Sequence, residues 1–300
     1  MAETTPPRLF CFGLGYSASH LAHRLLARGW QVAGTVRTDD KAAQLREQGI
    51  ETHVFDRDRP LPDAARALAG TTHLLVSVPP DGQGAGDAAL DHHAGDIAGV
   101  ADGLQWAGYL STTGVYGNRD GGWVDETSEL RPTSDRSARR VKAETAWRRL
   151  HDDAGVPMHT FRLAGIYGPG RGPFRAIREG TAKRIDLPEQ KFGRIHVDDI
   201  CQVLEASIAR PDPGAVYNVS DDEPAAPADV TAYACALLGV DPPPLVPWAE
   251  AEMSAMALTF WQDNKRVDNT RVHRDLGVQL RYPTYREGLR AVLEVEGGGR

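Results

Sequence analysis

A run of small residues near the start of the chain has the spacing of a phosphate-binding turn. Residues 13–18 read Gly-Leu-Gly-Tyr-Ser-Ala, a G-x-G-x-x-A pattern that directly follows an apolar run at 8–12. The first glycine suits a sharp turn, the second lets the backbone approach a pyrophosphate, and the third small residue lets the next helix pack closely. Free N–H groups at that helix N-terminus attract the anion. We therefore predict a dinucleotide site at Gly13, Gly15, Tyr16, Ser17 and Ala18, the alternative being a tight turn without a ligand.

The next apolar run ends in an arginine. In a site for NAD, an acidic residue roughly 20 positions after the glycines binds the adenosine ribose hydroxyls. Here residues 30–36 are followed by Arg37, and no carboxylate comes before Asp39. A guanidinium pairs well with a phosphate. Arg37 therefore favours NADP over NAD, unless it is an ordinary solvated side chain.

Strand-like and helix-like runs alternate through the first half of the chain, and these elements must position the turn. Strands are expected at 8–12, 30–36, 51–55, 73–78, 107–111 and 158–163, and helices at 17–28, 39–48, 62–68, 87–104 and about 134–152. Short connections between such elements are typical of parallel βαβ units. The sequence therefore predicts an α/β fold, a Rossmann-type doubly wound parallel sheet, followed by a smaller and less regular lobe.

Further motifs follow in order along the chain. They are Ser111–Gly117 (STTGVYG), Arg162 with Ile166–Gly170 (IYGPG), Ile195–Asp199 (IHVDD), Tyr217–Val219 (YNV) and Tyr282–Leu289 (YPTYREGL). In this order and spacing they resemble the extended short-chain dehydrogenases/reductases, the NAD-dependent epimerase/dehydratase group, from about residue 8 to 293. Ala138 stands where the group carries a tyrosine, and Phe12 and Ala18 stand where extended members usually carry glycines. The chain therefore looks like the atypical branch of the group.

The resemblance implies two domains and additional cofactor contacts. An NAD(P)-binding Rossmann domain would comprise residues 5–168 plus about 194–220, and a substrate-binding lobe about 169–193 plus 221–296. Asp56 would reach the adenine amino group, with a simple turn aspartate as the alternative. Val78 and Pro79 would line the nicotinamide ribose, and Gly165 belongs to the same expected set.

The resemblance also implies a catalytic set that is incomplete here. The family combines a Ser or Thr with Tyr-x-x-x-Lys; these positions map to Thr112 and Lys142, but Ala138 stands where the tyrosine belongs. Losing a general acid or base costs about 10²–10⁴ in rate. Tyr116 is a candidate replacement acid, or else a packing or substrate-lining residue. Thr112 either hydrogen-bonds a substrate carbonyl or only stabilises its own loop. Lys142 either binds the ribose hydroxyls of the cofactor or is an ordinary solvated lysine.

We therefore expect an NAD(P)-dependent oxidoreductase of the epimerase/dehydratase type. Its substrate would be a small carbonyl compound or a sugar-nucleotide-like molecule, handled without the usual tyrosine. The alternative is a non-catalytic NAD(P) sensor or regulatory protein.

The composition of the chain limits the kinds of ligand and partner that we expect. The 300 residues carry 34 Lys and Arg against 41 Asp and Glu, a net charge of −7 that disfavours general nucleic-acid binding. No apolar run approaches the ~18 residues of a membrane span. Cys11, Cys201 and Cys235 are too scattered for a disulfide framework or zinc site. We expect a cytoplasmic protein without a metal, with a small-molecule substrate and, as an open alternative, a homodimeric partner.

Overall fold

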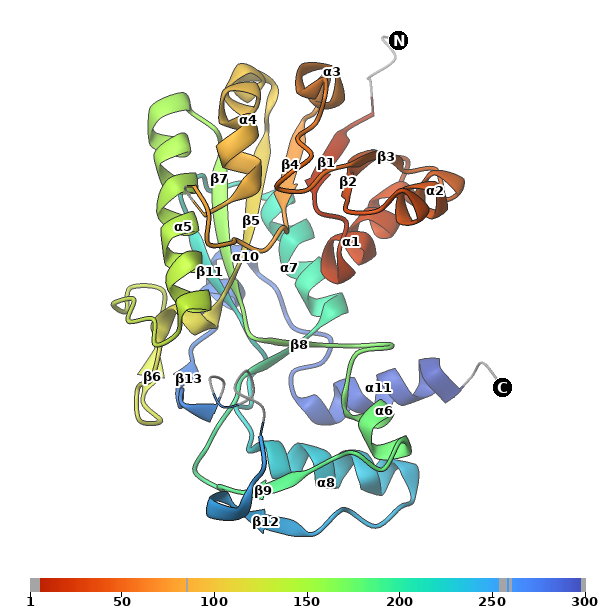
Figure 1. The fold of residues 1–300 in the computed structure, drawn as a ribbon, viewed down its shortest axis with the longest axis vertical. Helices are drawn as coiled ribbons and strands as arrows, with labels where there is room; N and C mark the ends of the chain where they lie inside the picture. The colour runs from red at the N-terminus through yellow and green to blue at the C-terminus, as the bar shows by residue number, and fades with distance from the viewer. Residues whose placement is uncertain (1–5, 85, 254–257, 259–260, 298–300) are drawn as a thin grey trace. The chain divides into compact units, whose positions relative to one another are not determined.

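The computed structural model describes residues 6–84, 86–253, 258 and 261–297. The chain forms two compact units (Figure 1). The first comprises Met1–Ser111, Ala138–Phe161 and Leu204–Val216, and the second Thr112–Ser137, Arg162–Val203 and Tyr217–Arg300. The limits of these two units differ from the domain boundaries predicted from the sequence. The predicted assignment to a cofactor-binding and a substrate-binding domain stays a prediction. The predicted start at residue 5 lies outside the described residues.

A seven-stranded sheet is the centre of the fold. Its strands are β1 (Arg8–Phe12), β2 (Gln31–Val36), β3 (Glu51–Val54), β4 (His73–Val76), β5 (Trp106–Thr112), β7 (Met158–Leu163) and β11 (Val216–Val219). Their order is β11-β7-β5-β4-β1-β2-β3 (Figure 1), and β1 pairs in parallel with both β2 and β4. The chain therefore reverses its direction of strand addition beside β1, the switch point at which such sheets bind ligands. The predicted Rossmann-type α/β fold is confirmed.

Helices cover both faces of this sheet. They are α1 (Tyr16–Leu26), α2 (Asp39–Glu47), α3 (Ala64–Leu68), α4 (Ala88–Gly99), η1 (Ala101–Gly103), α5 (Asp135–Ala154) and α7 (Val197–Ala209). Among the described residues, none of the helices is both long and apolar enough to cross a membrane.

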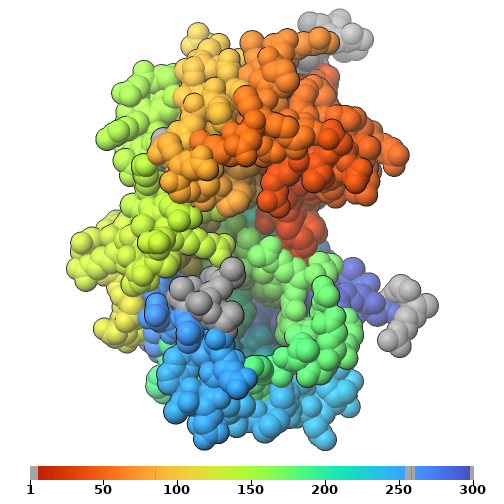
Figure 2. All heavy atoms as spheres, in the orientation of Figure 1, coloured from red at the N-terminus to blue at the C-terminus, as the bar shows by residue number. Residues whose placement is uncertain are grey.

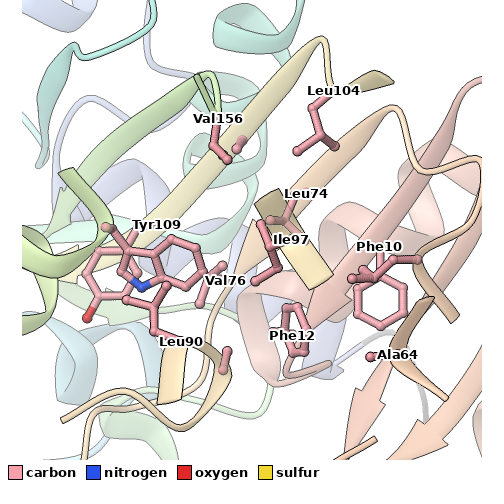
Figure 3. Close-up of a cluster of buried hydrophobic side chains, with 14 of the residues drawn as sticks. Phe10, Phe12, Ala64, Leu74, Val76, Leu90, Ile97, Leu104, Tyr109 and Val156 are labelled. Atoms are coloured by element: carbon pink, nitrogen blue, oxygen red, sulfur yellow. The ribbon is translucent and has the colours of Figure 1, made fainter. Parts of the chain in front are cut away.

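The core of the first unit explains why these helices pack where they do. Phe10 and Phe12 of β1 and Tyr109 of β5 are fully buried in one cluster with Leu90 and Ile97 of α4 (Figure 3). Successive side chains of a strand point to opposite faces, so the residues between them face the other side. Figure 2 shows the red and orange surface that the first strands and helices of this unit present.

The opposite face of the sheet is held by polar contacts as well as by packing. The indole N–H of Trp106 in β5 donates to Ser207 of α7 at 3.0 Å. Arg24 of α1 pairs with Glu205 of α7, with 2.7 Å between Nε and Oε1. Together these bonds fix α7 against β5 and α1.

The second unit is built from short elements around its own core. They are η2 (Thr113–Tyr116), β6 (Trp123–Val124), β8 (Gly165–Tyr167), α6 (Pro173–Arg178), β9 (Arg184–Asp186), β10 (Arg194–His196), α8 (Pro227–Leu238), β12 (Leu245–Pro247), η3 (Trp248–Glu250), β13 (Arg266–Val267), α10 (Thr270–Leu276) and α11 (Tyr285–Gly297). Tyr167, Phe174, Val230 and Leu289 are buried together in its core. Such short elements match the less regular lobe predicted from the sequence.

Candidate functional site

The turn between β1 and α1 is a backbone conformation that requires glycine. Gly13 has a φ of +91°, and a Cβ added there would lie 3.0 Å from Cγ1 of Val78. The Gly13 N–H donates to Oγ1 of Thr35 at 2.9 Å, and the Leu14 N–H donates to the Thr35 carbonyl at 2.7 Å. Hydrogen bonds thus hold the turn to β2, and the turn lies against the segment that follows β4.

The N-terminus of α1 differs from those of its neighbours in the first unit. Thr38, Asp63 and Asp87 cap α2, α3 and α4 by accepting a hydrogen bond from a backbone N–H. The N-cap of α1 is Gly15, which has no side chain to do so. A Cβ added to Gly15 would have Ser77 Oγ, at 3.9 Å, as its nearest neighbour within 4 Å. Open space therefore lies beside the N-terminus of α1, where no N-cap side chain accepts a hydrogen bond from the first backbone N–H groups of the helix.

The first turn of α1 offers its backbone rather than its side chains. Ser17 is 5% exposed and Ala18 is fully buried, so both side chains face the protein. The Tyr16 ring lies 4.6 Å from the His20 ring, and His20 Nδ1 hydrogen-bonds the Tyr16 carbonyl. The positive end of the helix dipole and the backbone amides of this turn are the elements that can bind an anion. These residues fit the pyrophosphate of a dinucleotide.

Arg37 and Asp56 lie at the adjoining ends of β2 and β3. Arg37 is exposed, directly after β2. Its carbonyl accepts a hydrogen bond from Nη2 of Arg59 at 2.6 Å, and Asp56 pairs with the same arginine, with 3.1 Å between Oδ2 and Nη2. The structure therefore brings both predicted residues to one place and adds Arg59, which sequence reasoning missed.

Val78, Pro79 and Lys142 also belong to the first unit. Val78 contacts the glycine turn, as described above, and Pro79 follows it. The Lys142 ammonium on α5 donates to the Gly84 carbonyl at 2.8 Å, so it reaches the segment that begins with these two residues. The ribose-binding role of all three stays a prediction.

Thr112 and Gly165 fall in the second unit. Thr112 Oγ1 accepts a hydrogen bond from the Gly114 N–H at 3.1 Å, and such a hydroxyl can still donate its own hydrogen. The preceding Ser111 points to the opposite side of β5 and donates to the buried Glu144 instead. Gly165 opens β8 and donates its N–H to the Gly193 carbonyl at 3.1 Å. The Thr112 hydroxyl thus keeps a hydrogen to donate, and its substrate-binding role stays a prediction.

Tyr116 is part of a buried network in the second unit. Its hydroxyl donates to Asn218 Oδ1 at 2.6 Å and accepts from Arg162 Nη1 at 2.9 Å, and the side chain is fully buried. Burial raises the pKa of Tyr116 to about 12, although Arg162 and Asn218 oppose the rise. The geometry favours a structural role, and the catalytic role stays a prediction without support from it.

The residue at the position where the resemblance predicts a tyrosine lies on the surface of α5. This residue, Ala138, is exposed, one helical turn before Lys142. The described residues contain no group of three or more His, Cys, Asp or Glu side chains that is able to hold a metal ion. The catalytic roles of Thr112 and Lys142 stay predictions.

The strand order, glycine turn and uncapped helix together define a Rossmann-type α/β protein with a dinucleotide-binding geometry. No protein-family model matches the chain. A solved structure of a conserved protein of unknown function from Silicibacter pomeroyi is 48% identical and superposes with a TM-score of 0.89, covering 96% of this chain and 99% of that one.

Other relatives agree with this class. Protein YeeZ of Escherichia coli is 29% identical over 280 residues, 90% of this chain and 94% of YeeZ. A dTDP-glucose 4,6-dehydratase of Streptomyces griseus is 27% identical over 248 residues, 78% of this chain and 66% of that protein. MoeE5, solved with UDP-glucuronic acid and NAD, has the same fold, with 20% identity, a TM-score of 0.76 and coverage of 98% and 100%. The chain is therefore similar, over most of its length, to NAD-dependent epimerase/dehydratase-type proteins, in sequence to the dehydratase and in fold to MoeE5.

Proposed function

We propose that this protein is an NAD(P)-dependent oxidoreductase of the epimerase/dehydratase type. The observation that carries the proposal is the uncapped N-terminus of α1, which follows a glycine turn at the switch point of the sheet. The solved MoeE5 complex contains NAD, which supports the same class of cofactor here. When bound, the nicotinamide would accept or supply a hydride, and this chain would bind and orient it.

The proposed substrate is a small carbonyl compound or a sugar-nucleotide-like molecule. Thr112 would donate a hydrogen bond to the substrate oxygen, and Lys142 would exchange its Gly84 partner for the ribose hydroxyls. The dehydratase from Streptomyces griseus and MoeE5 act on or bind nucleotide sugars by name, which supports the substrate class. The group that transfers the proton would be water or a side chain other than the usual tyrosine.

NADP is the proposed cofactor rather than NAD. Arg37 follows β2 where NAD-specific proteins carry a carboxylate. A charge-assisted hydrogen bond contributes about 1.5–3 kcal/mol, which corresponds to roughly ten- to a hundredfold in affinity.

Turnover tests this function. Purified protein with NADPH should reduce at least one member of a panel of dTDP- and UDP-4-keto sugars and simple ketones, followed at 340 nm. Thr112→Ala should lower kcat by about 10²-fold or more, because removal of one donor to a developing oxyanion costs that much. Thr113→Ala, its neighbour, serves as the matched control. Turnover unaffected by Thr112→Ala would contradict the assigned role.

A non-catalytic NAD(P) sensor is the second candidate. It is favoured by Ala138 in place of the tyrosine and by the commitment of the Tyr116 hydroxyl to Asn218 and Arg162. Tight cofactor binding without turnover of any panel member, together with a cofactor-dependent change in association state, would establish it.

A further inference from the structure

A second arginine lies beside Arg37 because of a short turn after β3. Asp56 and Arg59 pair with each other through their backbones, Asp56 N–H to the Arg59 carbonyl at 3.1 Å and Arg59 N–H to the Asp56 carbonyl at 3.2 Å. This turn directs the Arg59 guanidinium back to the end of β2, where Nη2 donates to the Arg37 carbonyl at 2.6 Å. Two guanidinium-bearing residues therefore meet at the edge formed by β2 and β3.

The Asp56 carboxylate holds this turn. Oδ1 accepts from the backbone N–H groups of Asp58 at 2.9 Å and Arg59 at 3.0 Å, and Oδ2 accepts from Arg59 Nε at 3.1 Å. Burial raises the pKa of Asp56, but these hydrogen bonds lower it more, so the carboxyl ionises below its ordinary range. Asp56 thus fixes both the backbone and the guanidinium of Arg59.

One side of the Arg59 guanidinium is only loosely engaged. Nη1 lies 3.8 Å from Oδ2 of Asp39, and these side chains are 51% and 85% exposed. Exposed ion pairs of this kind contribute about 0–1 kcal/mol. A phosphate dianion, with three acceptor oxygens and more charge, would compete successfully with this carboxylate.

We propose that Arg59, together with Arg37, binds the 2′-phosphate of the NADP adenosine ribose, with Asp56 as the positioning residue of Arg59. The inference rests on the proposed function, because it assumes that the first unit holds the dinucleotide. It assigns to Asp56 a different task from the adenine contact implied by family resemblance: its oxygens are already committed to the turn that carries Arg59.

Phosphate rather than a carboxylate or a neutral ligand fits the geometry. Arg59 Nη1, which only the 3.8 Å contact with Asp39 engages, can donate to a phosphate oxygen, and the exposed Arg37 side chain adds a second positive charge. The carboxylates nearby, Asp39, Asp40 and Asp58, would repel any anion that lacks this specific pairing. NAD, which has only hydroxyl groups at this position, would gain little from Arg59.

Calorimetric titration with NADP⁺ and NAD⁺ tests the assignment. Arg59→Gln should raise the Kd for NADP⁺ about tenfold and leave the Kd for NAD⁺ within twofold, since one charge-assisted contact is lost. Arg59→Lys, which keeps the charge without the fork, should give an intermediate loss. Asp56→Asn should shift selectivity in the same direction, about threefold, because one oxygen acceptor and the charge attraction are removed. Arg66→Gln, an exposed arginine on α3, should change neither Kd.

The outcomes separate this inference from the proposed function. If the wild-type protein binds both dinucleotides and Arg59→Gln changes neither Kd, or both equally, the role of Arg59 is wrong and the dinucleotide site stands. If the folded wild-type protein binds neither at millimolar concentration, the proposed function is wrong and this inference falls with it. A melting temperature of Arg59→Gln within 2 °C of wild type confirms that folding is not the cause.

Discussion

The glycine turn of the first unit and the Thr112–Tyr116 segment of the second prepare for a ligand in different ways. The turn relies on the backbone, through a positive φ at Gly13 and the uncapped amides after Gly15. The other segment relies on hydroxyl groups, and that of Tyr116 is already committed to two protein partners. A binding geometry made of backbone survives side-chain changes around it, whereas proton transfer by a single phenol is removed by a single substitution.

The largest effect should come from giving α1 the cap that it lacks. Gly15→Asp should weaken NADP⁺ and NAD⁺ binding at least a hundredfold, because the new carboxylate would accept the amide hydrogen bonds and repel the pyrophosphate. The fold should tolerate it, since a Cβ meets nothing closer than 3.9 Å there. Ligand-induced shifts in melting temperature measure the loss.

Gly172→Asp is the matched control for that variant. Gly172 is the N-cap of α6 in the second unit, also without side-chain capping, and a Cβ there has no neighbour within 4 Å. Its cofactor affinity should equal that of wild type. Undiminished binding by Gly15→Asp would remove the distinction between the two regions.

The second effect should come from restoring the phenol. Ala138→Tyr should raise turnover of NADPH with a reactive carbonyl about 10- to 100-fold, because it places a general acid one helical turn before Lys142. The exposed position on α5 accommodates the ring. Ala138→Phe, which lacks the hydroxyl, should stay at the wild-type rate. Equal rates for the two variants would show that proton transfer does not limit this protein.

A smaller effect, on stability, should follow from Tyr116→Phe. Removing the hydroxyl takes away the donor to the buried Asn218 Oδ1 and one acceptor of Arg162 Nη1, which costs about 1–3 kcal/mol of unfolding free energy. Urea denaturation measures that change, and cofactor affinity should be unaltered. A stable variant whose turnover falls a hundredfold would instead make Tyr116 the replacement acid.

The sequence predicts the first unit well because its signals are local. The run at 8–12 coincides with β1, and the run at 158–163 with β7, since apolar periodicity and glycine turns act over a few residues. The predicted strand at 73–78 is shorter in the structure: β4 ends at Val76, and Val78 instead packs against Gly13.

Local sequence patterns do not predict contacts between segments that are far apart in the chain. Arg59 meets the Arg37 carbonyl 22 residues away only because β2 and β3 are neighbours. The bond between Tyr116 and Asn218 spans 102 residues, so the sequence alone left its hydroxyl as a candidate acid. An Asp followed three residues later by Arg, directly after a strand, is the one local signal that would have indicated the Arg59 turn.

Amide hydrogen exchange tests the central claim most directly, because it reports where the dinucleotide binds. Saturating NADP⁺ should slow exchange at the amides of Tyr16, Ser17 and Ala18 in the wild-type protein and leave them unchanged in Gly15→Asp. If millimolar NADP⁺ slows no amide at the start of α1, or protects only other parts of the chain, the pyrophosphate does not bind there and the account is wrong.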